Sequence, residues 1–462
     1  MERYDVAIVG AGPAGIFAAL ELVKGREGLK ILILEKGKDL KRRLCPLQSR
    51  RTNCSRCHPC AIVSGWGGAG AFSDGKLTLT PEVGGRLGEF LPPAQVQELL
   101  EYVDQVYLRF GAPEKVHGSP EDERVAEIQR KAALADLKFI PVPIRHLGTG
   151  RTQEILKGMK EYLEARGVEI RTETPVERVR VEGNRVVGVE TSQGEFIRAS
   201  RVVLAPGREG SSWLQGVSRE LGLALSVNPV DIGVRVEIPA VVMEAITDVV
   251  YEPKFIFYSR KFDDKVRTFC VNPYGEVVLE NNEGVVTVNG HSYADKKTEN
   301  TNFALLVSNQ FSAPFREPIA YGRYIASLAN LLCGGVIVQR LGDLLAGRRS
   351  TEERLARSLV TPTLKEATPG DLSLVLPYRH LASIVEMLEA LDKMAPGVYS
   401  RHTLLYGVEV KFYSSRLELT PGLETRIKGL YAAGDGAGIT RGLAQASASG
   451  VLVARSILED IS

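Results

Sequence analysis

Hydrophobic residues near the N-terminus form two short continuous runs, residues 4–9 and 30–34, on either side of a helical pattern at residues 13–24. Continuous apolar runs of this length are typical of strands buried on both faces of a parallel sheet. Together the three segments predict a β-α-β unit of about 30 residues, the usual length of such a unit. The chain therefore opens with a nucleotide-binding type of fold.

Helical periodicity returns in three later segments, and short strands follow them. We predict helices at residues 94–110, 121–135 and 152–166, and an extended stretch at 138–144 that contains Pro141 and Pro143. From residue 168, short strands alternate with Gly- and Asn-containing turns and predict a small meander that ends in a buried strand at 201–205. We assign this meander to the first domain.

A second, β-rich domain interrupts the first between about residues 221 and 402. Its strands are predicted at 230–238, 255–258, 268–271, 277–279 and 285–288, and its helices at 321–332 and 381–391. The chain then returns to a strand at 429–433 and a helix at 443–458. We expect an α/β protein in which a Rossmann-like domain with a three-layer parallel sheet, residues 1–220 and 403–462, is interrupted by a mixed α+β domain, residues 221–402.

Composition and charge narrow the class of protein. The chain has 44% hydrophobic and 25% charged residues, which is typical of a folded globular protein, and a net charge of +2 predicts neither nucleic-acid nor membrane attraction. The longest stretch without polar side chains, residues 6–20, is shorter than the roughly 18 residues of a membrane span and follows no basic head. We expect a cytoplasmic protein.

A glycine-rich fingerprint joins the first strand to the first helix. Gly10, Gly12 and Gly15 form a GxGxxG sequence, with Pro13 and Ala14 inside it, and Glu35 follows at the end of the next strand. The glycines allow a tight turn, close approach of a pyrophosphate and close packing of helix on strand, while the acid accepts hydrogen bonds from a ribose. The alternative is a tight strand-to-helix turn without a ligand.

The fingerprint, Glu35, the segment 203–207 (Val-Leu-Ala-Pro-Gly) and the segment 429–435 (Gly-Leu-Tyr-Ala-Ala-Gly-Asp) resemble flavoproteins of the glutathione-reductase-like FAD-binding class. The resemblance implies FAD as the cofactor and Asp435 as the ligand of its ribityl chain. It further implies that the backbone at Gly442, Leu443 and Ala444 faces the flavin and that Val176 lies beside the adenine. Ala205, Gly207 and Gly434 complete this set.

A closer resemblance covers most of the chain. The segments 65–77 (Gly-Trp-Gly-Gly-Ala-Gly-Ala-Phe-Ser-Asp-Gly-Lys-Leu), 231–237 and 442–450 are similar to a group of prokaryotic FAD-dependent dehydrogenases that are named only generically. Small residues at Gly67, Gly68 and Ala69 let main-chain amides approach a planar ring or a phosphate, and Ser73 and Lys76 then reach polar flavin edges. The alternative is a glycine-rich surface loop.

A second strand-GxGxxG-helix unit for a nicotinamide cofactor is absent from the sequence. The chain thus resembles the branch of flavoproteins that has a substrate domain in that place. We predict an FAD-dependent oxidoreductase that exchanges a hydride between flavin N5 and a small, mostly apolar substrate. Electrons come from the substrate, from transient NAD(P)H or from another redox centre; a flavin monooxygenase and a non-enzymatic electron-transfer flavoprotein are the alternatives.

Four of the six cysteines, Cys45, Cys54, Cys57 and Cys60, fall within 16 residues and include a CxxCxxC sequence. Thiolates at this spacing can bind a [4Fe-4S] cluster or zinc, with His58 replacing one of the cysteines at a zinc site, or can cycle as dithiol and disulfide; unligated cysteines are the remaining alternative. Eight basic residues lie between residues 36 and 56. They predict a docking surface for an acidic electron carrier such as ferredoxin, contacts to the cofactor through Lys36 and Arg43, or a solvated charged surface.

The inserted domain offers few candidates for chemistry. His291 is one of six histidines and is the candidate acid or base beside the flavin, although a turn histidine explains it as well. Asp231 and Arg235 lie four residues apart on a predicted strand and predict an ion pair on one face. Arg145 precedes a helix that binds an anion or is capped by Thr149 or Gly150.

Overall fold

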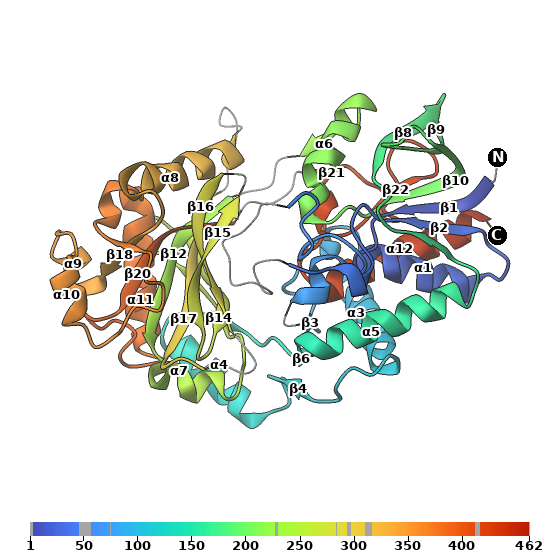
Figure 1. The fold of residues 1–462 in the computed structure, drawn as a ribbon. Coiled ribbons are helices and arrows are strands. Elements are labelled where there is room, and N and C mark those ends of the chain that lie inside the picture. The colour runs from blue at the N-terminus through green and yellow to red at the C-terminus, as the bar shows by residue number, and fades with distance from the viewer. Residues whose placement is uncertain are drawn as a thin grey trace. The chain divides into compact units, whose positions relative to one another are not determined.

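The computed structural model describes residues 3–45, 57–73, 75–226, 230–282, 284–292, 297–309, 317–411 and 416–461. The chain divides into two compact units, drawn in Figure 1. Unit 1 comprises Met1–Val116, Ile144–Asn228 and Ser414–Ser462, and unit 2 comprises His117–Pro143 and Pro229–Tyr413. The division falls a few residues later than the predicted boundaries at 220 and 402, and it assigns residues 117–143 to unit 2.

Unit 1 is built on a parallel sheet. The strands β7 (Glu169–Arg171), β2 (Ile31–Leu34), β1 (Arg3–Val9), β10 (Phe196–Leu204) and β22 (Leu430–Ala432) lie side by side in that order, and each pairs with its neighbour in parallel. This confirms the predicted β-α-β unit and the return of the C-terminal segment to the first sheet. All four residues of β2 and all three of β22 are buried, as the continuous apolar runs require.

The predicted meander branches from the long strand β10. Its second half pairs with β22, while Phe196–Arg198 pairs antiparallel with β9 (Arg185–Thr191), which pairs in turn with β8 (Val176–Glu182). The strand predicted at 201–205 is therefore only the second half of β10. The sheet of unit 1 is mixed, not purely parallel.

Two helices cross closely against this sheet. In α1 (Pro13–Gly25) residues 14–22 are all buried, and in α12 (Leu443–Ile461) residues 444–451 are all buried. A Cβ at Gly450 would lie 2.1 Å from the backbone oxygen of Ala14, so only glycine permits this crossing. The remaining helices of unit 1 are α3 (Pro93–Arg109), α5 (Thr149–Glu164) and α6 (Ser211–Glu220).

Unit 2 contains an eight-stranded sheet. Its order is β19 (Thr368–Pro369), β18 (Ile337–Arg340), β20 (Leu404–Lys411), β12 (Val230–Pro239), β17 (Asn300–Asn309), β14 (Lys265–Asn272), β13 (Lys254–Tyr258) and β5 (Lys138–Ile140). Strands β18, β20 and β17 are absent from our prediction, and the extended stretch predicted at 138–144 contains β5, which forms the edge of this sheet. Asn300, Asn302 and Asn309 resemble turn residues, yet they lie within a ten-residue strand.

One face of this sheet packs on helices. Ile232, Val234 and Val236 of β12 share a hydrophobic core with α4 (Glu123–Leu134), α7 (Ala240–Thr247), α8 (Pro318–Cys333) and α11 (Tyr378–Asp392). The alternate residues Asp231, Arg235 and Glu237 project from the opposite face. Part of that face is covered by a hairpin of β15 (Glu276–Asn282) and β16 (Val285–His291). No helix in the described ranges has both the length and the apolarity of a membrane span.

Candidate functional site

Three glycine-rich turns meet at the carboxyl ends of β1, β10 and β22. A Cβ at Gly10 would lie 2.1 Å from the Ala205 backbone oxygen, and one at Gly436 would lie 2.3 Å from the Gly207 backbone oxygen. A Cβ at Gly434 would lie 3.1 Å from the Cβ of Ala14. The structure thus brings together residues that are more than 400 positions apart in the sequence. In an open α/β sheet this edge is where ligands bind.

The N-terminus of α1 faces open space at Gly12. Gly12 has extended backbone (φ −80°, ψ −176°), and among the described residues no side chain caps the helix and nothing lies within 4 Å of a Cβ built at Gly12. A Cβ at Gly15, in contrast, would lie 2.0 Å from the Gly10 backbone oxygen. The residues present therefore fit a pyrophosphate at Gly12, where amides and the helix dipole attract an anion.

The carboxylate of Glu35 holds the turns in place. One oxygen accepts a hydrogen bond from Ala11 N (2.9 Å), and the other accepts from Gly37 N (2.8 Å) and Gly65 N (2.9 Å). The side chain is buried. Glu35 therefore connects the fingerprint, the end of β2 and the start of the loop at 65–73, in addition to its predicted contact with a ribose.

This loop lies against the fingerprint. Gly67 N donates to Ala11 O (2.8 Å), and a Cβ at Gly68 would lie 3.1 Å from Gly12 Cα. Gly67 and Gly68 both have positive φ, at 85° and 58°, which favours glycine. A Cβ at Gly70 would lie 2.6 Å from a methyl group of Leu443, the first residue of α12. The two predicted cofactor segments, 67–69 and 442–444, are thus neighbours.

The Arg43 side chain lies beneath the loop and is buried. Its guanidinium donates to the backbone oxygens of Ala61 (2.9 Å), Ile62 (2.8 Å), Trp66 (2.6 Å) and Gly68 (2.8 Å). Burial lowers the pKa of Arg43 to about 10, against the opposing effect of Glu35 and Cys60. These four hydrogen bonds fix the main chain of the loop, so Arg43 positions the loop. The sequence predicts a direct contact between Arg43 and the cofactor instead.

Asp435 lies at the end of β22, before α12. Its carboxylate accepts from Thr440 Oγ1 (2.8 Å) and Gly442 N (3.3 Å), and the Arg208 guanidinium lies 3.7 Å away. Burial raises the pKa of Asp435, while Arg208 and these hydrogen bonds act in the opposite direction. Among the described residues nothing lies within 4 Å of a Cβ at Gly442, which has φ +97°. The start of α12 thus faces open space, as α1 does at Gly12.

The remaining predicted cofactor residues of unit 1 lie near these turns or beside the sheet. Lys36 forms an ion pair with Glu209. Ser73 Oγ donates to Gly70 O (2.9 Å) and accepts from Gly75 N (3.2 Å). Lys76 begins β3 (Lys76–Thr78), Ala69 lies within the 3₁₀ helix Gly68–Phe72, and Val176 begins β8 and is buried. Their contacts to a cofactor stay predictions.

Sequence reasoning missed one segment of this site. Residues 83–86 lie against the chain that leads into α12: Arg441 N donates to Gly84 O (2.6 Å), and Arg86 N donates to Ile439 O (2.8 Å). Gln445 Nε2 donates to Val83 O (2.9 Å). Gly84 and Gly85 have positive φ, and this glycine pair was the available signal.

The candidate catalytic residue belongs to unit 2, and the candidate metal residues form no cluster in the described part of the chain. His291 is the exposed last residue of β16, in unit 2, and its role stays a prediction. Cys45 and Cys60 are partly buried and Cys57 is exposed, all three as free thiols, while Cys54 lies outside the described residues. No group of three or more metal-binding side chains occurs among the residues that the structure describes. The iron-sulfur, zinc and dithiol predictions therefore have no support here.

Two predictions about charged side chains are wrong. Arg235 pairs with Glu409 through two bonds of 2.7 and 2.8 Å, and Asp231 pairs with Arg267 at 2.5 Å, because the nearest opposite charge lies on another strand. Arg145 binds the Asp104 carboxylate through two bonds of 2.6 and 2.7 Å, so it is not available to a helix-bound anion. The N-cap of α5 is Gly148, not Thr149 or Gly150.

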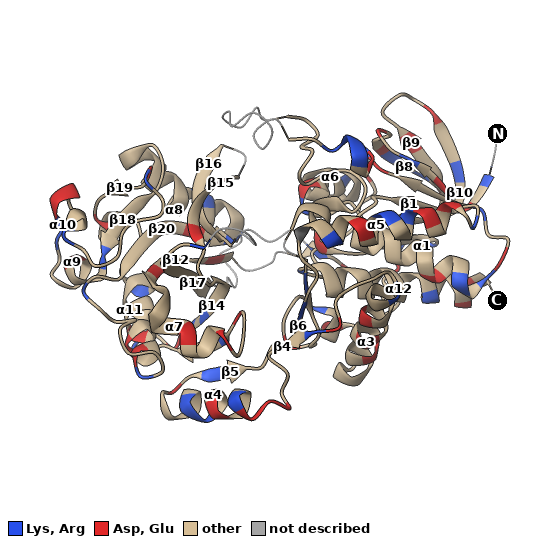
Figure 2. Cartoon of the chain, turned by 60° about the horizontal axis from the view of Figure 1, so that its bottom comes forward, with Lys and Arg blue, Asp and Glu red and all other residues tan. Residues whose placement is uncertain are grey.

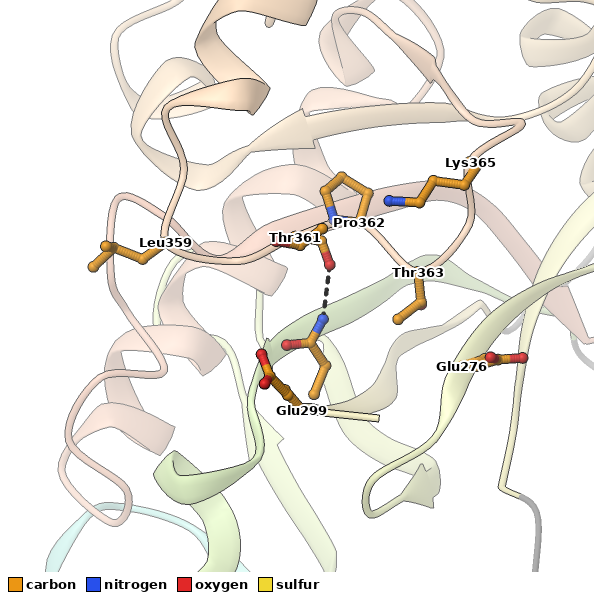
Figure 3. A pocket seen from close by; sticks show the side chains of 8 residues that line it. Glu276, Glu299, Leu359, Thr361, Pro362, Thr363 and Lys365 are labelled. Carbon is orange, nitrogen blue, oxygen red and sulfur yellow. Dashed lines mark hydrogen bonds between the residues drawn. The ribbon is translucent and has the colours of Figure 1, made fainter. Parts of the chain in front are cut away.

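Unit 2 contains a separate surface cavity of about 290 Å³, shown in Figure 3. Glu276, Glu299 and Lys365 line it, and Asn300 Nδ2 donates to Thr361 O (2.9 Å) across one wall. Behind the wall, buried Glu237 accepts from Thr363, Tyr406 and Asn300. Burial raises the pKa of Glu237, and these hydrogen bonds counteract the shift. This network supports the wall of the cavity.

Comparisons with known proteins indicate the class of the protein. Residues 229–412 match the family model described as "FAD-dependent protein, C-terminal domain-like", and residues 93–301 match "FAD dependent oxidoreductase". An uncharacterized protein of Clostridium beijerinckii is 28% identical over 98% of this chain and 80% of its own length. A D-amino acid dehydrogenase of Cereibacter sphaeroides is 42% identical over 93 residues, which is 20% of each chain. The chain is an FAD-dependent oxidoreductase.

Similar solved structures include glycine oxidase from Bacillus cereus, with 17% identity over 99% of this chain and 96% of that one (TM-score 0.39). Another is 3-ketosteroid-Δ4-(5α)-dehydrogenase from Rhodococcus jostii, with 14% identity over 99% and 97% (TM-score 0.44).

Proposed function

We propose that unit 1 binds one FAD in an extended form and that the enzyme uses it as a dehydrogenase of a small organic substrate. The observation that carries the proposal is the convergence of the fingerprint, the loop at 65–73, Gly207 and Asp435 at one edge of the sheet. A flavin supplies the redox chemistry when bound, by exchanging a hydride with the substrate. The protein supplies binding and orientation.

Each segment has its own part in this proposal. The amides at the start of α1 bind the pyrophosphate where Gly12 leaves room, and Glu35 orients the fingerprint and the adenosine ribose. Asp435 binds the ribityl chain, and the start of α12 at Gly442 faces the flavin ring. This assignment follows the likeness to glutathione-reductase-like flavoproteins.

The nature of the substrate and the partners is also part of the proposal. We propose a small substrate with a mostly apolar body. The local similarity to a D-amino acid dehydrogenase adds amino acids to the compounds to be tested. A cytoplasmic location fits the five described cysteines, which are all free. The CxxCxxC sequence is what supports an iron-sulfur relay through the four cysteines. The basic residues beside it are what support an acidic carrier such as ferredoxin.

Substitution of Gly12 tests the site of FAD binding. Alanine is compatible with the extended backbone of Gly12 and meets no neighbour within 4 Å among the described residues, so Gly12→Ala leaves the fold intact while its methyl group occupies the space proposed for the pyrophosphate. We expect at least tenfold weaker binding of FAD, measured by fluorescence titration of the apoprotein and by the flavin content after purification.

The matched control is Gly216→Ala in α6, another glycine with nothing within 4 Å of its Cβ among the described residues. This variant should bind FAD as the wild type does. If Gly12→Ala also retains wild-type affinity, the pyrophosphate does not lie at the start of α1. Anaerobic loss of flavin absorbance with D-amino acids, or its return when apolar unsaturated compounds are added to enzyme that has first been reduced with dithionite, then identifies the substrate class.

A further inference from the structure

The sheet of unit 2 has a cation-rich face on the side opposite its helices. Lys138 of β5, Ile256 of β13 and Arg267 of β14 face one another across three neighbouring strands, so their side chains project from the same face. Lys265 lies two residues before Arg267 and faces Tyr258. The residues between them in sequence, Phe255, Phe257 and Val266, are buried in the core on the other side.

This face, which we call the basic face, continues onto the next strands. Arg267 pairs with Asp231 of β12, and Lys411 of β20 lies 3.1 Å from Glu409 and 3.5 Å from Glu280. Lys254 pairs with Glu252. The basic face comprises Lys138, Lys254, Lys265, Arg267 and Lys411, of which Lys254, Arg267 and Lys411 lie near the ring of Phe269. Figure 2 shows basic residues on β5 and β14.

An aromatic ring lies at the centre of these cations. Lys254 Nζ lies 5.0 Å, Arg267 Cζ 4.9 Å and Lys411 Nζ 6.0 Å from the centroid of Phe269. The ring partly stabilises these charges through its electron-rich face. It also provides an apolar surface beside them on which the body of an organic ligand can pack.

Positive charge at Lys265 is incompletely compensated. Lys138 and Arg267 repel its ammonium group, and Asp231, which already pairs with Arg267, attracts it. Burial lowers the pKa of Lys265, and the two neighbouring cations lower it further. A bound anion would remove this electrostatic penalty, since an opposite charge favours the charged form of a lysine.

Two residues of this part of the sheet lie next to unit boundaries in the sequence. Asp231 follows the entry of the chain into unit 2 at Pro229 by two residues, and Lys411 precedes its exit at Tyr413 by two residues. Asp231 and Lys411 face each other on β12 and β20. Asp231 and Lys411 therefore lie beside two of the four places where the chain passes between the units.

We propose that Lys138, Lys265 and Arg267 bind the carboxylate of a small organic acid whose apolar body packs on Phe269. The assignment of this acid as the substrate rests on the proposed function; the anion site itself does not. A single carboxylate matches the small local excess of positive charge and the partial burial of the site, whereas a polyanion needs a larger and more open surface.

Calorimetric titration of the flavin-loaded enzyme tests the site with phenylacetate, the neutral phenylacetamide and inorganic phosphate. We expect phenylacetate to bind more tightly than phenylacetamide, and Lys265→Met to weaken phenylacetate binding about tenfold, as the loss of one charge-assisted hydrogen bond does. Lys138→Met should weaken it less, because Lys138 is exposed. Lys393→Met, an exposed lysine after α11 on the other side of the sheet, is the control and should change nothing.

Equal binding of phenylacetate and phenylacetamide, or wild-type affinity in Lys265→Met, would overturn the anion site. Binding of phosphate without phenylacetate would overturn its assignment to a carboxylate. The proposed function is judged separately, by flavin absorbance. If organic acids reduce the flavin at equal rates in wild type and Lys265→Met, the dehydrogenase stands and the assignment of the bound acid as its substrate fails. If phenylacetate binds as expected but no organic acid reduces the flavin, the anion site stands and the proposed function fails for this class of substrate.

Discussion

Single charged residues in unit 1 stabilise irregular backbone. Glu35 accepts three amide hydrogen bonds and Arg43 donates to four carbonyl oxygens, all on main-chain groups that lie outside the strands. Burial of a charge is costly unless such bonds compensate for it. Both side chains therefore fix the shape of the turns before any ligand binds.

His380 is a buried residue whose ionisation affects stability. Its ring lies in the core of unit 2, 3% of its surface is exposed, and neither ring nitrogen has a hydrogen-bond partner among the described residues. Burial lowers its pKa to about 4, with Arg379 acting in the same direction and Asp264 against it. The unfolded chain, where a histidine has a pKa of about 6.5, therefore binds this proton more readily.

From this shift we predict a loss of stability in acid. The contribution of His380 to the free energy of unfolding is fully present above about pH 6.5 and is lost as the pH falls toward 4, by up to about 3 kcal/mol. In His380→Leu this loss should be absent. Urea unfolding at several pH values measures the difference, with the exposed His58→Leu as control. Parallel pH profiles for wild type and His380→Leu would contradict the prediction.

At the scale of elements, the crossing of α1 and α12 determines the geometry of the site. α1 begins at the fingerprint and α12 begins beside Asp435, and the two helices touch where Gly450 meets Ala14. Gly434 N also donates to Ser449 Oγ (3.0 Å), which fixes the turn before Asp435 to the same helix. A shift of α12 therefore moves both halves of the candidate site.

Gly450→Ala should separate the two helices. The new methyl group would overlap the backbone of Ala14, which cannot rotate away, so we expect a loss of about 1–3 kcal/mol in the free energy of unfolding, typical of overpacking. FAD affinity should fall as well, because the start of α12 moves away from Asp435. Thermal unfolding and FAD titration check both effects, with Gly216→Ala as the control. Unchanged stability would show that the helices can separate at no cost.

The sequence predicts those elements whose apolar pattern lies within one short segment. It does not predict elements and ion pairs that depend on side chains of other strands. The strands and helix around Gly12 follow from continuous apolar runs and a fingerprint of fixed spacing. Strand β17, with Asn300 and Asn302, was missed because its polar residues are satisfied by neighbours on other strands. For the same reason Asp231 and Arg235 were assigned to each other, and the role of Arg43 under the loop was not foreseen.

At the scale of the whole molecule, each unit has a hydrophobic core of its own. The core of unit 1 contains β1, β2, β10 and α12, and the main core of unit 2 contains β12, β17 and α11. The proposed FAD site consists entirely of residues from unit 1. FAD should therefore stabilise unit 1 directly and unit 2 only through any coupling between the two.

Calorimetry should resolve two unfolding transitions. FAD should raise the midpoint temperature of only one of them, the transition of unit 1. A ligand at one hundred times its dissociation constant stabilises the unit that binds it by about 2.7 kcal/mol. Scans of the apoprotein with increasing FAD measure both midpoints, and Gly12→Ala, which should respond weakly, is the control. A single transition that moves as a whole would show that the two units unfold together.

The order of the strands also has a consequence for biosynthesis. β22 and α12, which complete unit 1, are the last elements of the chain, and β20, which lies between β18 and β12 in unit 2, comes only shortly before them. Neither sheet can be completed while the ribosome is still translating the middle of the message, because each sheet lacks a strand that is synthesised later. Loading of the flavin, which needs Asp435 and the start of α12, must therefore wait until those residues have been synthesised, and β10 lacks its neighbour β22 until then.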